Sequence, residues 1–226
     1  MKTAVLVDGG FFIKRYWSLC PEKKNAPPSK VVRALYAGVL QDLRLANKNT
    51  PRRELYRILF YDCKPIDKRL QNPVTGKGFN TVSSPEAQFR LTFHEELKRQ
   101  RKVALRLGHL GKEAYWIIKP AQTKRLLSGK LSITDLTESD VKYDVRQKGV
   151  DMKIGLDIAS LAYKRSVDQI ILIAGDADFV PAAKLARREG IDFVLDPMWN
   201  PIDSNLHEHI DGLVSSWPRP NKNSAK

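Results

Sequence analysis

Short apolar runs that stop at an acidic residue recur along the chain. Two of them are residues 3–7, followed by Asp8, and residues 169–174, followed by Gly175-Asp176. Residues 54–61 (ELYRILFY), followed by Asp62, predict a further strand. Uninterrupted apolar runs of this length are typical of strands buried on both faces, as in a parallel sheet. The pattern therefore predicts several buried strands, each with a carboxylate at its end.

Segments with a helical hydrophobic period lie between these runs. The predicted helices are residues 11–19, 29–43, 85–101, 151–162, 179–188 and 206–213. The second has the plainest pattern, because Val31, Leu35 and Val39 return to one face and Ser29 can cap its first turn. Further strands are expected at residues 102–107, at 115–118, which is hairpin-like, and at 191–195.

This order of strands and helices predicts an α/β fold. Strands that alternate with helices form a mostly parallel central sheet with right-handed crossovers. Residues 64–85 are rich in Pro, Gly, Asn and Ser and predict a long loop, while residues 120–146 have no clear pattern. We expect one domain over residues 1–215, with an inserted hairpin and loop region at about 64–146, and a basic, disordered tail at 216–226.

Five aspartates are expected to meet at one edge of this sheet, where ligands of such folds bind. Asp8, Asp62 and Asp176 follow strands, Asp178 comes two residues later, and Asp151 begins the helix that leads into the 169–174 strand. Packed carboxylates raise each other's pKa unless a cation neutralises them, and oxygen ligands favour Mg²⁺ or Mn²⁺ over zinc. The cluster predicts such a metal site; the simpler alternative is that each acid caps a helix or turn.

The overall charge has the opposite sign to this cluster. The 226 residues include 39 Lys and Arg against 25 Asp and Glu, which gives a formal charge of +14 and a pI of about 9.8. A polyanion is therefore the expected partner, nucleic acid before a membrane surface. An acidic centre inside a basic surface suits a metal-dependent nuclease, in which metal ions activate water and stabilise the leaving oxygen.

Other classes of protein are disfavoured. No apolar run approaches the roughly 18 residues of a membrane span, and the N-terminal run is too short for a secretory signal. We therefore expect a cytoplasmic protein with no membrane partner. Two cysteines, Cys20 and Cys63, are too few for a disulfide framework or a zinc knuckle.

Residues outside the cluster are candidates for substrate binding. Lys124, Arg125 and Lys130 belong to a basic stretch that could hold phosphates, although such stretches are usually solvated surface. Asn200 and Asn205 follow the last strand and could contact a phosphate or a metal-bound water. A helix cap by Asp203 or Ser204 is the simpler use of that segment.

Three motifs, in this order, resemble the NYN domain of the PIN-like nuclease superfamily. They are Val7-Asp8-Gly9-Gly10-Phe11, Lys148-Gly149-Val150-Asp151 and Ala174-Gly175-Asp176-Ala177-Asp178-Phe179, the last followed by Pro181 and a turn at Gly190. The resemblance spans about residues 3–213, is most specific over 148–197, and is greatest to the bacterial LabA-like branch. Many members have an asparagine near Gly10-Phe11, which this chain lacks.

The resemblance implies a PIN-like α/β/α sandwich and an endoribonuclease site that uses Mg²⁺ or Mn²⁺. The metal-site acids of the family correspond to Asp8, Asp151, Asp176 and Asp178, and the match at Asp62 is shorter. We expect the first three to hold the principal ion while Asp178 and Asp62 assist a second ion or orient water. RNA is then the partner, and a homodimer is compatible with the inserted hairpin.

Two other functions are alternatives to a nuclease. A non-catalytic RNA-binding adaptor would retain the fold, although a binder gains nothing from a negatively charged groove. A phosphatase or phosphotransferase is disfavoured because a haloacid-dehalogenase-like enzyme needs Asp-x-Asp after its first strand, where this chain has Asp8-Gly9-Gly10. A topoisomerase-primase-like domain would need a glutamate where Asp8 stands.

Overall fold

The computed structural model describes residues 1–45 and 51–220, apart from the side chains of 110–114 and 146–148. Within these residues, a seven-stranded sheet has the order β6-β5-β2-β1-β7-β8-β9, and all its neighbouring strands are parallel except β5 and β6. The strands are β1 (Lys2–Asp8), β2 (Glu54–Cys63), β5 (Val103–Ile118), β6 (Val141–Lys148), β7 (Gln169–Ile173), β8 (Asp192–Asp196) and β9 (Gly212–Leu213).

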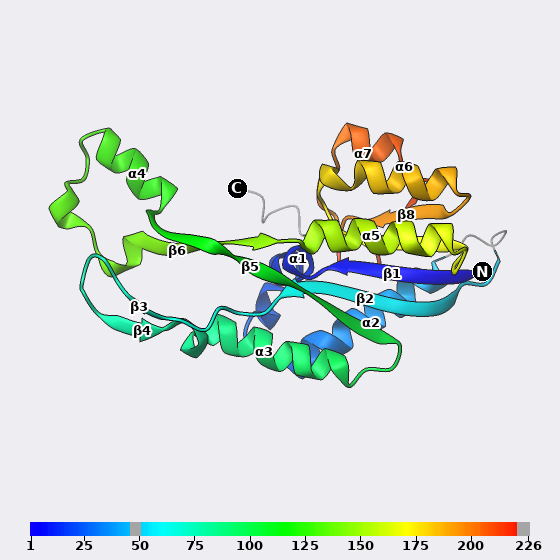
Figure 1. The fold of residues 1–226 in the computed structure, drawn as a ribbon, viewed down its shortest axis with the longest axis horizontal. Coiled ribbons are helices and arrows are strands. Elements are labelled where there is room, and N and C mark those ends of the chain that lie inside the picture. The colour runs from blue at the N-terminus through cyan, green and yellow to red at the C-terminus, as the bar shows by residue number, and fades with distance from the viewer. Residues whose placement is uncertain (46–50, 221–226) are drawn as a thin grey trace.

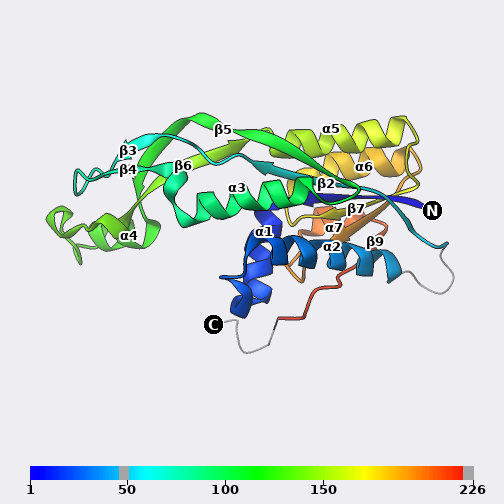
Figure 2. The same ribbon diagram turned by 90° about the horizontal axis from the view of Figure 1, so that it is seen from below.

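Helices cover both faces of the sheet (Figures 1 and 2). One layer contains α1 (Gly9–Leu19), α2 (Pro28–Arg44) and α3 (Pro85–Lys98), and the other contains α5 (Val150–Tyr163), α6 (Val180–Arg188) and α7 (Ser204–Glu208). Side chains alternate along β1, so Val5 and Val7 pack into the first layer while Ala4 and Leu6 pack into the second. The predicted α/β/α sandwich with a mostly parallel sheet is confirmed.

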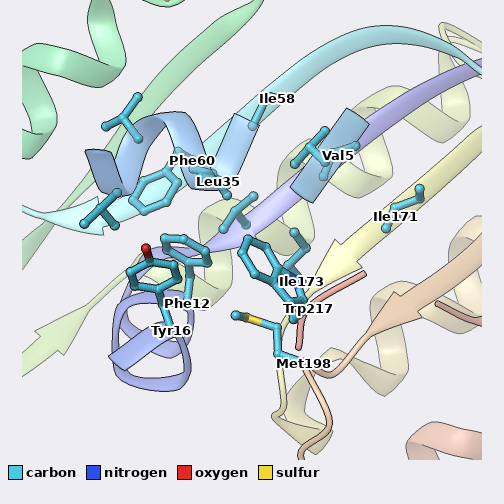
Figure 3. Close-up of a cluster of buried hydrophobic side chains, with 14 of the residues drawn as sticks. Val5, Phe12, Tyr16, Leu35, Ile58, Phe60, Ile171, Ile173, Met198 and Trp217 are labelled. Carbon is cyan, nitrogen blue, oxygen red and sulfur yellow. The ribbon is translucent and has the colours of Figure 1, made fainter. Parts of the chain in front are cut away.

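The first core is rich in aromatic side chains, several of which are drawn in Figure 3. Phe12, Tyr16 and Trp217 form a ring cluster with centroid distances of 5.5–6.3 Å. Trp217 is 6% exposed, and the hydroxyl of Ser216 donates to the carbonyl of Gly38. Both residues were assigned to the tail, yet they pack against α1 and α2; residues 221–226 of that tail lie outside the described residues.

Two predicted strands are one strand in the structure. Residues 102–107 and 115–118 both belong to β5, which pairs with β2 from Val103 to Gly108 and with β6 from His109 onward. The strand continues because it exchanges one partner for another, which no local pattern records. Beyond this exchange β5 and β6 form a ribbon that leaves the sandwich and ends at α4 (Pro120–Leu127), as Figures 1 and 2 show.

The predicted loop at residues 64–85 contains a small hairpin, β3 (Arg69–Gln71) and β4 (Gly78–Asn80). The ring of Phe79 lies 6.0 Å from that of Trp116, which in turn lies 5.6 Å from Tyr143. These contacts attach the hairpin to the β5–β6 ribbon. The inserted region is therefore a structured arm, and its base lies beside the carboxyl ends of β1 and β2.

Candidate active site

Asp8 is held where β1 changes into α1. Its carboxylate is the N-cap of α1, with Oδ1 accepting from the backbone N–H of Phe11 at 3.1 Å. The turn is very tight at Gly9, where an added Cβ would lie 2.5 Å from the ring of Phe60 and 2.6 Å from the carbonyl oxygen of Tyr61. Only glycine fits there, so the helix begins directly at the strand end and fixes the carboxylate.

Asp151 lies at the same edge of the sheet, at the start of the helix that connects β6 to β7. Gly149, at φ 80°, adopts the left-handed conformation that turns the chain from β6 into α5. Asp151 therefore lies in the first turn of α5, where the helix dipole favours a negative charge. The side chain is exposed.

Asp176 and Asp178 lie on the turn that follows β7. Asp176 caps the short 3-10 helix η5 (Ala177–Phe179), with Oδ1 accepting from the N–H of Asp178 at 3.1 Å. Both side chains are exposed. The capping role that each acid could have alone is thus real for Asp8 and Asp176, and it leaves further carboxylate lone pairs available on each.

The pKa values show that these acids interact. Burial raises the pKa of Asp8 to about 6, helped by the charges of Asp151 and Asp62 and opposed by the backbone N–H groups of Phe11 and Gly10. Burial and the charges of Asp176 and Asp178 likewise raise the pKa of Asp151. The fold therefore brings Asp151 within electrostatic reach of Asp8 on one side and of Asp176 and Asp178 on the other.

Asp62 belongs to a different kind of cluster. Its side chain is fully buried and accepts from Nη1 of Arg90 at 2.6 and 2.9 Å, while Nε2 of His94 lies 2.9 Å from Oδ2. Burial alone would raise the pKa of Asp62, but His94, Arg90 and the N–H of Cys63 together hold that pKa below its usual range. Both oxygens thus bind groups of the protein itself, and a metal-ligand role for Asp62 stays a prediction.

Sequence reasoning missed the two α3 residues that bind Asp62. Arg90 and His94 are one helical turn apart, so they share a face of a helix that the sequence did predict. It also passed over Asp196, which ends β8 and is fully buried. Asp196 accepts from the indole N–H of Trp217 at 2.8 Å and neighbours Asp42, so it lies in the core rather than among the exposed acids.

The other predicted residues have varied positions. Asp157, which lies further along α5 than Asp151, accepts from the hydroxyl of Tyr61 at 2.8 Å and from Arg106 at 3.1 Å. Asp203 caps α7 through the N–H of Asn205, as the simpler alternative held. Asn205 is exposed on α7, which contacts η5 and so lies beside Asp178.

The remaining substrate-binding candidates do not gather with the acids. The side-chain amide of Asn200 donates to the neighbouring carbonyl of Pro201 at 3.2 Å. Lys124 and Arg125 belong to α4, and Lys130 follows it; all three are exposed at the far end of the β5–β6 ribbon (Figures 1 and 2). A role in phosphate binding for these three residues would require a substrate that extends along the arm.

The donor set of the exposed acids suits a hard divalent cation. Asp8, Asp151, Asp176 and Asp178 offer only carboxylate oxygens, which Mg²⁺ and Mn²⁺ prefer. Among the described residues, however, no three His, Cys, Asp or Glu side chains are close enough together to hold a metal ion as they stand. The fit is therefore one of chemistry and charge, and binding would require the exposed side chains of Asp151, Asp176 and Asp178 to turn toward one ion beside the half-buried Asp8.

Residues 92–200 match the model of the NYN domain family. The matched segment covers a little under half of the chain and includes Asp151, Asp176 and Asp178. This NYN match supports a nuclease-like domain acting on nucleic acid. Within the described residues, no helix has the length and apolar character needed to cross a membrane.

Two further comparisons give little more. A crystal structure of a protein of unknown function from Vibrio parahaemolyticus is similar over 94% of this chain and 91% of that one, at 17% identity and a TM-score of 0.42. No curated protein matches the chain.

Proposed function

We propose that the protein is a ribonuclease of the NYN type that hydrolyses RNA phosphodiesters with Mg²⁺ or Mn²⁺. The observation that carries the proposal is the group of mutually repelling carboxylates at the carboxyl edge of the sheet, where burial and neighbouring acids raise the pKa values of Asp8 and Asp151. Within the described residues, no lysine or arginine forms an ion pair with Asp8, Asp151, Asp176 or Asp178. A bound cation would relieve this repulsion.

Each residue has a role in this proposal. Asp8, Asp151 and Asp176 hold the principal ion, and Asp178, with Asp62 as a further candidate, orients water or assists a second ion. When bound, the metal supplies an activated water and charge stabilisation for the leaving oxygen. The backbone N–H of Phe11 holds Asp8 in place, and the N–H of Asp178 holds Asp176. The same motifs suggest the LabA-like branch of the family.

Substitution of one central acid tests the proposal. Purified protein with Mn²⁺ should cleave single-stranded or structured RNA, and Asp176→Asn should lower the rate by at least about 100-fold, because the loss of a charged ligand weakens metal binding and catalysis together. Asp168→Asn is the matched control, since Asp168 lies before β7, at the opposite edge of the sheet, and its side chain accepts only from the N–H of Lys2 among the contacts described. Equal cleavage by Asp176→Asn and wild type would point to a contaminating nuclease and refute the proposal.

The second candidate is an RNA-binding adaptor without catalysis. It is favoured by one observation, the lack of a ready three-ligand group among the described residues. The adaptor would bind RNA with a steep salt dependence and show no turnover at any Mn²⁺ concentration. A thermal shift on Mn²⁺ addition that is absent in Asp176→Asn would argue against it.

A further inference from the structure

A groove runs between α1 and α3, beside the acids but on the other face of the sheet. It consists of two adjoining cavities of about 600 and 610 Å³. Trp17, Lys24 and Glu86 line both cavities, which makes them continuous. The α1–α3 groove is defined here by Lys14, Trp17, Lys24, Glu86, Phe89 and Arg90.

The groove leads away from the candidate active site. One end is lined by Gly10, in the first turn of α1, two residues after Asp8. Arg90 lines the same cavity, and its guanidinium also binds Asp62. A chain lying in the groove would therefore have one end close to Asp8.

The groove has the charge expected for a phosphate backbone. Lys14 and Lys24 are exposed, and neither forms an ion pair within the part of the chain that the structure describes. Glu86 is the one acid among the groove residues, and its carboxylate lies 3.7 Å from Nε of Arg90. The two lysines thus keep their full charge for an anionic ligand.

The groove also offers an aromatic surface. The rings of Trp17 and Phe89 meet at 5.3 Å and 61°, and Phe89 stacks on Phe93 at 5.7 Å. The indole N–H of Trp17 is buried and has no hydrogen-bond partner among the described residues.

We propose that the α1–α3 groove binds the part of a single-stranded RNA substrate that lies next to the cleaved bond. Lys14 and Lys24 contact phosphates, and Trp17 contacts a base. A basic groove with aromatic side chains is the usual solution for binding single strands without sequence preference. The inference rests on the proposed function, and it puts the substrate on α1 and α3 rather than on Lys124, Arg125 and Lys130 of the arm.

Charge reversal in the groove tests the phosphate contacts. The probe is a labelled oligouridine of about 12 nucleotides, and its binding is followed by fluorescence anisotropy in EDTA so that no cleavage occurs. We expect Lys14→Glu/Lys24→Glu to weaken binding at least about tenfold and to reduce the slope of log K against log salt by about 1.4, that is, about 0.7 for each lost phosphate contact. The matched control is Lys164→Glu/Lys184→Glu, which makes the same change of charge at two exposed positions, the C-cap of α5 and the middle of α6.

Tryptophan fluorescence tests the base contact. Oligouridine should quench the emission of the wild type, and the quenching should be lost in Trp17→Phe, which keeps an aromatic ring in place. Polyglutamate of equal charge serves as a competitor that has no bases. If polyglutamate displaces the RNA equally well and quenching does not depend on Trp17, the groove binds acidic protein and the inference is wrong.

The outcomes separate this inference from the proposed function. If the two double variants bind oligouridine alike, or if Lys124→Glu/Arg125→Glu alone abolishes binding, the groove is not the binding site even if RNA is cleaved. If the groove variants lose binding while no RNA is cleaved at any Mn²⁺ concentration, the groove is correct and the catalytic proposal fails.

Discussion

Asp8 and Asp62 lie at the ends of adjacent parallel strands, yet their pKa values are shifted in opposite directions. Asp8 is paired in register with Tyr61, the residue before Asp62, and burial raises its pKa to about 6. The pKa of Asp62 is lowered, although its side chain is fully buried. The difference is what surrounds each carboxylate: other acids around Asp8, and Arg90 and His94 around Asp62.

The comparison separates two uses of a buried carboxylate. Asp62 binds Arg90 and His94 of α3, so it joins β2 to α3 and stabilises the fold. Asp8 has hydrogen bonds from N–H groups and no cation of the protein within the described residues, so its ionisation costs folding free energy. An acid of the second kind is a better candidate for binding an external cation.

Removal of Asp62 should have the largest effect on stability. Asp62→Ala leaves Arg90 and His94 without their carboxylate, and breaking a buried ion pair in this way costs about 3–5 kcal/mol. We expect the lower end of that range, because the side chain of Arg90 is 18% exposed and can be partly hydrated. Urea denaturation at neutral pH measures the change.

The control for this variant is Asp67→Ala, which removes an exposed acid a few residues away. It should alter the free energy of unfolding by no more than about 0.5 kcal/mol. A loss below about 1 kcal/mol in Asp62→Ala would show that the ion pair contributes little to the stability of the fold.

Removal of the Asp8 charge should stabilise the protein, in contrast to the loss of stability expected for Asp62→Ala. Asparagine caps a helix about as well as aspartate, so Asp8→Asn keeps the bond to Phe11 and removes the cost of ionisation. The folded-state pKa is about 6 against an ordinary 3.8, and one pKa unit is worth about 1.4 kcal/mol, so the gain at neutral pH is at most about 3 kcal/mol.

The pH dependence distinguishes this effect from a change in packing. A raised carboxyl pKa costs nothing while the group is protonated in both states, so the gain of Asp8→Asn is absent below the unfolded value of 3.8 and complete above about 6. Urea denaturation across this window should show the difference growing with pH. A constant difference between the variant and the wild type would contradict the cause assigned to the pKa shift.

In the wild type, Mn²⁺ binding should weaken as pH falls below about 6, because Asp8 takes up a proton.

The edge of the sheet where these acids meet could be predicted from sequence, because strand ends are visible as apolar runs. β1, β2, β7 and β8 lie close to their predicted ranges, and parallel pairing brings their ends together without further information. The placement of Asp8 and Asp176 at this edge follows from this geometry, whereas Asp151 is placed there by the start of α5.

The partners of Asp62 could not be predicted in the same way. The sequence predicts the helix that begins at residue 85 but not the rotation of that helix about its axis relative to the sheet. This rotation decides whether Arg90 and His94 face Asp62. The continuity of β5 and the packing of Trp217 were hidden for a similar reason, since both depend on partners distant in sequence. The topology could therefore be predicted from the sequence, but the contacts between individual side chains could not.

Asp151 extends the comparison to an acid with little burial, and its substitution should have the smallest effect. Its pKa is raised by slight burial and by Asp176 and Asp178, but the side chain is exposed and water screens these charges. Asp151→Asn should therefore stabilise the fold by less than about 1 kcal/mol. Since the Debye length falls from about 10 Å at 0.1 M salt to about 3 Å at 1 M, the part of the gain that comes from Asp176 and Asp178 should disappear in concentrated NaCl. The part that comes from burial should persist, as should most of the gain of Asp8→Asn. A gain in Asp151→Asn that is as large as that of Asp8→Asn and insensitive to salt would mean that burial alone, and not the charge of neighbouring acids, raises the pKa values of both residues.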